Sequence, residues 1–152
     1  QGGATFQNAL IPNNISIDKN IGCIVNGHWG LKTYEDFSKV LNNVELIEKS
    51  YETLETIYIE DYSKFNNLHI TSNETINGIQ IRELSKIHNA NLIVDMSSDI
   101  GSYKLSFENI DYIYAGAQKN LGIPGVTLCI INKDFIKENS NPTYLNLYKL
   151  NG

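Results

Sequence analysis

One lysine stands where an apolar segment gives way to small residues, and an amine in that position can act as a nucleophile. Lys119 follows the β-branched and aromatic run 110–114 and precedes a second apolar run, 126–131. Such compositions favour strands. A lysine held between two buried strands is expected to be partly desolvated, which lowers its pKa. It could then form a Schiff base with an aldehyde. The alternative is an ordinary solvated loop lysine.

Three further residues with chemical uses follow other apolar runs: Trp29, Thr75 and Asp95. Each has an ordinary explanation on its own, as a core ring, a turn hydroxyl or a turn acceptor. In open α/β sheets, however, ligands gather at the carboxyl ends of the strands. Pyridoxal phosphate needs a lysine for covalent attachment, a carboxylate for its ring nitrogen and an aromatic ring to stack on. The four residues together meet those needs.

The opening segment could bind the phosphate of such a cofactor. Gly2 and Gly3 precede 4–11, which is expected to be a short helix that Pro12 ends. Backbone N–H groups at a helix N-terminus bind phosphate dianions. The turn 2–5 is therefore a candidate phosphate site.

The elements that must position these residues alternate between helix and strand. Residues 21–25, 44–48, 68–71 and 92–94 are apolar enough for strands, and Asn77-Gly78 is a turn signal. The capping-box spacing of Thr33 and Asp36 predicts a helix over 33–41, and Ile81, Leu84 and Ile87 fit one face of another. Segment 49–62 has no clear pattern. The fold class is α/β, a mainly parallel sheet with flanking helices.

Composition excludes several classes of function. The 152 residues suffice for one domain, and a net charge of -5 argues against nucleic acid and anionic membranes as partners. No apolar stretch approaches the ~20 residues of a membrane helix. Cys23 and Cys129 form no CxxC pair, so a reducing, cytoplasmic setting is expected. The three histidines lack the spacing of metal ligands, and no metal is predicted.

Five motifs together carry a family resemblance, and they cover nearly the whole chain. They are Gly2-Gly3-Ala4-Thr5-Phe6-Gln7 with Ile11-Pro12, Gly27-His28-Trp29, the segment 69–78, Val94-Asp95-Met96-Ser97-Ser98-Asp99-Ile100, and Tyr114-Ala115-Gly116-Ala117-Gln118-Lys119-Asn120-Leu121-Gly122. In order and spacing they resemble the phosphoserine aminotransferases, which are class V, fold-type I enzymes that use pyridoxal phosphate. The last two motifs are specific at the family level.

The resemblance implies a function and a role for each matching residue. The family transfers an amino group between glutamate and 3-phosphohydroxypyruvate in serine synthesis, as a homodimer. Lys119 would be the Schiff-base lysine and general base, Asp95 the partner of the pyridine nitrogen, and Trp29 the stacking ring. Thr75 would hydrogen-bond the cofactor. The phosphate would be bound by three further residues, Ala4, Thr5 and Gln118.

The sequence also departs from the family pattern. An N-terminal stretch with substrate-binding residues, a small C-terminal domain and an Asn-Thr pair contributed by the neighbouring subunit have no counterpart. Residues 1–152 are therefore expected to be the central, cofactor-binding part of the large domain, a piece of a longer protein. Two alternatives remain: a catalytically inactive structural or binding fragment, or another class V enzyme with a different substrate. Uncovered apolar faces would make the isolated chain self-associate.

Overall fold

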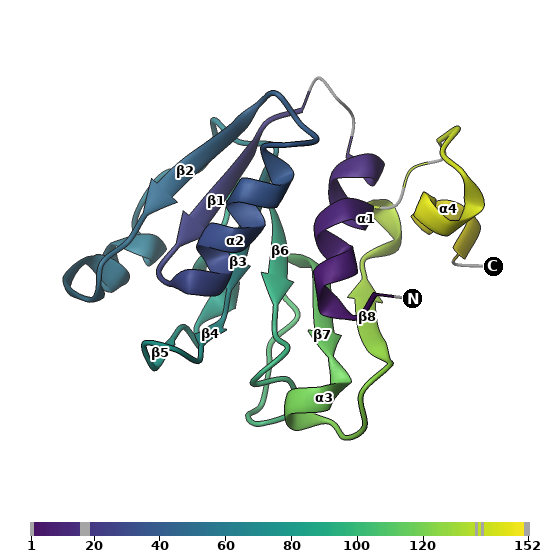
Figure 1. The fold of residues 1–152 in the computed structure, drawn as a ribbon. Coiled ribbons are helices and arrows are strands. Elements are labelled where there is room, and N and C mark those ends of the chain that lie inside the picture. Colours follow the sequence, from purple (N-terminus) through teal and green to yellow (C-terminus); the bar gives the residue numbers. More distant parts are fainter. Residues whose placement is uncertain (1, 16–18, 136, 138, 151–152) are drawn as a thin grey trace.

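Six strands form one sheet in the order β2-β1-β3-β6-β7-β8, and a two-stranded hairpin, β4-β5, lies beside it (Figure 1). This computed structural model describes residues 2–15, 19–135, 137 and 139–150. The strands are β1 (Ile21–Val25), β2 (Val44–Glu48), β3 (Asn67–Thr71), β4 (Asn73–Glu74), β5 (Ile79–Gln80), β6 (Asn91–Asp95), β7 (Ile110–Gly116) and β8 (Thr127–Ile131). The α-helices are α1 (Gln7–Asn14), α2 (His28–Phe37), α3 (Ala117–Asn120) and α4 (Leu147–Leu150). Short 3-10 helices cover Ala4–Phe6, Tyr51–Tyr58, Leu84–Lys86, Lys133–Phe135 and Thr143–Leu145.

The register of the parallel strands sets the position of Asp95. Within the described six-stranded sheet, β1, β2, β3, β6 and β7 run parallel and β8 pairs with β7 in the antiparallel sense. Asp95 pairs with Thr71 on one side and Tyr114 on the other. The carboxyl ends of β3, β6 and β7 therefore meet at one edge, as the mainly parallel sheet predicted from the sequence requires.

Apolar residues fill both faces of the central strands β1, β3, β6 and β7, as expected for parallel strands covered on both sides. Ile24, Leu68, Val94 and Ile113 belong to one buried cluster, to which the 3-10 helices Tyr51–Tyr58 and Leu84–Lys86 also contribute. The other cluster lies under α1 and α2, and its buried strand residues are Ile21, Cys23, Val25, Ile93, Tyr112 and Tyr114. Because side chains alternate along a strand, Asp95 shares the face of Ile93 and lies below these two helices.

The structure corrects three predicted elements. Helix α1 continues through Pro12 to Asn14, because a proline in the last turn removes one hydrogen bond without preventing two further helical residues. Helix α2 begins at His28 and ends at Phe37, rather than spanning 33–41. The segment 81–87 forms only a single 3-10 turn, although Ile81, Leu84 and Ile87 are all buried as predicted.

One side of the molecule exposes apolar side chains around β8. Phe107, Val126, Leu128 and Ile130 are each more than a third exposed. None of the helices among the described residues has both the length and the apolar character needed to cross a bilayer.

Candidate functional site

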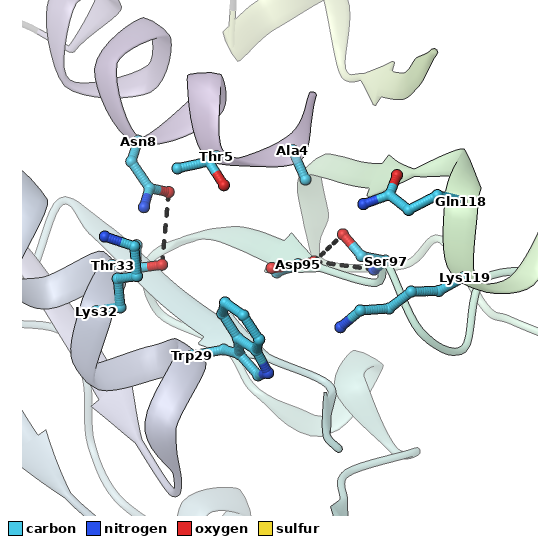
Figure 2. Close-up of a pocket in the computed structure, with 10 residues that line it drawn as sticks. All are labelled: Ala4, Thr5, Asn8, Trp29, Lys32, Thr33, Asp95, Ser97, Gln118 and Lys119. Carbon is cyan, nitrogen blue, oxygen red and sulfur yellow. Dashed lines mark hydrogen bonds between the residues drawn. The ribbon is translucent and has the colours of Figure 1, made fainter. Parts of the chain in front are cut away.

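A pocket opens at the carboxyl edge of the sheet, between the N-terminal ends of α1 and α2 and the short helix α3 (Figure 2). Its cavity measures about 120 Å³. It is lined by six of the seven residues that the sequence predicted: Ala4, Thr5, Trp29, Asp95, Gln118 and Lys119. The seventh, Thr75, does not line this cavity, but it contacts the Trp29 side chain. The fold thus gathers residues that lie up to 115 positions apart in the chain, from Ala4 to Lys119.

Asp95 lies at the end of β6, where its carboxylate is held by the residue two positions later. The backbone N–H and the hydroxyl of Ser97 donate to Asp95 Oδ1 at 2.8 Å and 2.6 Å. Burial raises the pKa of the Asp95 carboxyl above its ordinary value, while the Ser97 hydrogen bonds and the Lys119 ammonium act in the opposite direction. The site therefore holds an oriented, desolvated carboxyl group, whose ionised form a nearby positive charge would stabilise.

Trp29 forms one wall of the pocket from the first turn of α2. Its indole Nε1–H donates to Thr75 Oγ1 at 3.3 Å, which fixes the plane of the ring. The Lys119 ammonium lies over this ring, 4.9 Å from its centroid, a distance at which a cation is attracted to the π face. Figure 2 shows the lysine extending from α3 toward the tryptophan.

The expected desolvation of Lys119 is wrong. Lys119 lies in α3, beyond the end of β7, and its side chain is exposed. Helix α3 places Lys119 beyond the end of β7, so β7 and β8 do not bury its amine. The side chain nevertheless reaches the pocket that Asp95 and Trp29 share.

The far end of the pocket is formed by the start of the chain and by α3. The 3-10 helix Ala4–Phe6 runs directly into α1, so the expected glycine-rich turn leading into a helix is present. The first backbone N–H groups of this 3-10 helix have no hydrogen-bond partner within the helix. The Gln118 amide folds over Gly116, where an added Cβ would lie 2.7 Å from its Oε1 and 3.2 Å from the Ala4 Cβ. Ala4, Thr5 and Gln118 line this end of the pocket together, and the Thr5 hydroxyl and the Gln118 amide make it polar.

Four lining residues were not predicted from the sequence: Asn8, Lys32, Thr33 and Ser97. Ser97 carried a usable signal, because a serine two positions after an aspartate commonly donates to its side chain. Thr33 was interpreted as a helix cap, but its buried hydroxyl lies inside α2 and donates to Asn8 Oδ1 at 3.5 Å. Only the packing of α1 against α2 brings those two residues together.

Comparison with known proteins points to the same family that the sequence motifs resemble. The Aminotransferase class-V family model matches residues 2–145. The phosphoserine aminotransferase of Halalkalibacterium halodurans is 40% identical over 95% of this chain and 42% of its own length. That of Pasteurella multocida is 38% identical over 90% of this chain and 39% of its own. The solved phosphoserine aminotransferase from Bacillus circulans subsp. alkalophilus superimposes with a TM-score of 0.81 at 32% identity, over 98% of this chain and 43% of its own.

The chain spans about two fifths of the length of these relatives. An alanine–glyoxylate aminotransferase from Nostoc sp. has the same fold, with a TM-score of 0.80 at 21% identity over 99% of this chain and 45% of its own. The sheet is thus that of the fold-type I aminotransferases. With the family match covering nearly every residue, this chain belongs to the class V aminotransferase family.

Proposed function

We propose that the protein containing this chain is a phosphoserine aminotransferase, which transfers an amino group between glutamate and 3-phosphohydroxypyruvate with pyridoxal phosphate as cofactor. The observation that carries the proposal is the single pocket shared by Asp95, Trp29 and Lys119. The names of the relatives at 38–40% identity support the choice of substrates.

The residues of the pocket fit pyridoxal phosphate. Asp95 offers a buried carboxylate, oriented by Ser97, to the ring nitrogen, and the indole of Trp29 offers a flat face to the ring. Lys119 supplies the amine that would hold the cofactor covalently. The polar end described above would bind the phosphate through Ala4, Thr5 and Gln118. When bound, pyridoxal phosphate supplies an electron sink for charge that develops on the substrate α-carbon.

Each polar side chain then has a task that its geometry supports. The Asp95 carboxylate, oriented by Ser97, would hold a proton at the ring nitrogen. Thr75 fixes the indole through Nε1 and so keeps the stacking face in place. The Nζ amine of Lys119 would act as general base, carrying a proton from one carbon to another. Its exposure on α3 leaves it free to swing between Trp29 and the reacting atoms.

The proposal also covers the substrates, the compartment and the oligomeric state of the protein. We infer small-molecule substrates, a cytoplasmic setting and a homodimer in which a neighbouring subunit completes the phosphate site. The two free cysteines, Cys23 and Cys129, agree with a reducing compartment. Residues 1–152 would be the cofactor-binding part of the large domain, with the substrate-binding residues in the rest of the protein.

A turnover assay tests the proposal. The protein that contains this chain is supplied with pyridoxal phosphate, glutamate and 3-phosphohydroxypyruvate, and phosphoserine and 2-oxoglutarate are measured. We expect turnover that Lys119→Ala abolishes. Turnover with glyoxylate or pyruvate as acceptor, and none with 3-phosphohydroxypyruvate, would replace this substrate with another class V substrate. The absence of turnover with every acceptor would favour a binding or structural role.

A further inference from the structure

Glu74 is a fully buried acid whose two oxygens serve the backbone of another element. It ends β4 and is 0% exposed. Its Oε2 accepts from the backbone N–H of Trp29 at 3.0 Å, and its Oε1 accepts from that of Gly30 at 2.6 Å. Among the residues that the structure describes, no lysine, arginine or histidine forms an ion pair with it. The partners of this carboxylate are therefore the first N–H groups of α2.

The space for the carboxylate is provided by glycine. A Cβ added to Gly27 would lie 2.6 Å from both Cγ and Cδ of Glu74, and 2.8 Å from Oε2. A Cβ added to Gly30 would lie 3.3 Å from Oε1. Gly27 has an extended backbone, φ -178°, so its conformation does not require glycine. What requires glycine there is the close approach of Glu74.

The same hairpin also holds the indole that α2 carries. Thr75, the next residue, accepts from Trp29 Nε1 at 3.3 Å, and Asn77 Nδ2 donates to the carbonyl of Asn26 at 3.3 Å. The β4-β5 hairpin thus forms hydrogen bonds with both the backbone and the ring of Trp29. This ring is the wall over which the Lys119 ammonium lies.

We propose that Glu74 is a positioning residue that sets the orientation of Trp29 in the cofactor pocket. A negative carboxylate at a helix N-terminus is stabilised by the helix dipole and by charge-assisted hydrogen bonds. Here the N–H groups of Trp29 and Gly30 each face a separate oxygen of the Glu74 carboxylate. The amide of glutamine has one acceptor oxygen, so Glu74→Gln leaves one buried N–H facing an NH₂ group. The effect of Glu74 on pyridoxal phosphate rests on the function proposed above.

The test begins without cofactor, so that its first readout is independent of activity. We measure the fluorescence and near-ultraviolet circular dichroism of Trp29 in the protein that contains this chain, isolating this indole by subtracting the spectrum of Trp29→Phe. Glu74→Gln is expected to shift the Trp29 signal while the far-ultraviolet spectrum stays that of the folded protein. It should also weaken the binding of pyridoxal phosphate about tenfold, as expected when a misoriented indole loses its stacking on the cofactor ring. Glu83→Gln, an exposed acid that pairs with Lys86, is the matched control and should change neither.

Gly27→Ala reaches the same contact from the other side, because its Cβ would displace the Glu74 carboxylate. It should shift the Trp29 signal in the same direction, and the double variant should show less than the sum of the two effects. If Glu74→Gln does not fold, Gly27→Ala decides alone. A folded variant of either kind with an unchanged Trp29 signal and unchanged cofactor binding would overturn the proposal. A shifted Trp29 signal in a protein that binds no pyridoxal phosphate would support the positioning role and refute the proposed function.

Discussion

Ser97 donates two hydrogen bonds to a single oxygen of Asp95, one from its backbone N–H and one from its hydroxyl. The same hydroxyl accepts from the backbone N–H of Gly116 at 3.0 Å, at the end of the strand that leads to Lys119. Ser97 thus links the loop after β6 to the end of β7. This buried side chain therefore connects the Asp95 carboxylate to the backbone that leads to Lys119.

Removing the Ser97 hydroxyl should therefore weaken the connection between the loop after β6 and the end of β7. Ser97→Ala leaves the buried N–H of Gly116 without its partner and removes the shorter hydrogen bond to Asp95. We expect a loss of about 1–3 kcal/mol in unfolding free energy and weaker binding of pyridoxal phosphate. Denaturant unfolding and cofactor titration check both. Ser38→Ala, at an exposed helix end, is the control; equal effects of the two substitutions would refute the linking role.

Asp95 is expected to lower the stability of the cofactor-free protein and to strengthen cofactor binding. Its raised pKa means that the folded state binds its proton more tightly than the unfolded state, so its ionised form destabilises the fold near neutral pH. Asp95→Asn should raise the Tm of the cofactor-free protein and weaken cofactor binding.

Asp36 provides the opposite case for comparison. A hydrogen bond from Asn8 lowers the pKa of Asp36, with Lys39 and Lys32 contributing, so Asp36→Asn should lower the Tm instead. Thermal unfolding at pH 7 measures both. A lower Tm for Asp95→Asn would contradict this account of the pocket.

His69 should make the protein sensitive to mild acid. It is fully buried against Tyr114, whose hydroxyl lies 2.9 Å from Nε2, and burial lowers its pKa from 6.5 to about 3. Below pH 6.5 the unfolded state binds a proton that the folded state does not, so stability falls as the pH falls. The expected slope approaches about 1.4 kcal/mol per pH unit. Urea unfolding between pH 6.5 and 5 tests it, and His69→Gln should flatten the slope; a parallel slope in this variant would exclude His69 as the cause.

Two leucines in the strands on either side of β1 should differ in their contribution to stability. Leu68 in β3 is 0% exposed, whereas Leu46 in β2 is 39% exposed. Leu68→Ala should cost about 2–5 kcal/mol because it leaves a cavity in the core, and Leu46→Ala should cost much less. Chemical denaturation compares them, and similar losses would mean that the core is not where the structure puts it.

The strands and most of the site were predictable because their signals are local. The apolar runs 21–25, 44–48, 68–71 and 92–94 are strands with their ends within one residue of the prediction. The parallel order then placed the residues at strand ends, Asp95 among them, on one edge. The residue types at those ends favoured pyridoxal phosphate as the ligand, and the family resemblance supplied the role expected of each residue.

The parts that were not predictable depend on contacts between distant segments. The start of α2 was predicted five residues late because its N-terminal N–H groups are capped by Glu74, 45 residues after Trp29, and not by a neighbouring side chain. Lys119 was expected to be buried, but α3 carries it beyond the strands. The roles of individual residues toward the cofactor stay predictions.

The most direct test of the central claim is to locate the cofactor on the chain. The protein is incubated with pyridoxal phosphate, reduced with borohydride, digested and analysed by mass spectrometry. The account predicts one stoichiometric pyridoxyl adduct, on the peptide that contains Lys119, and its loss in Lys119→Ala. An adduct spread over surface lysines, or none on Lys119, would contradict it.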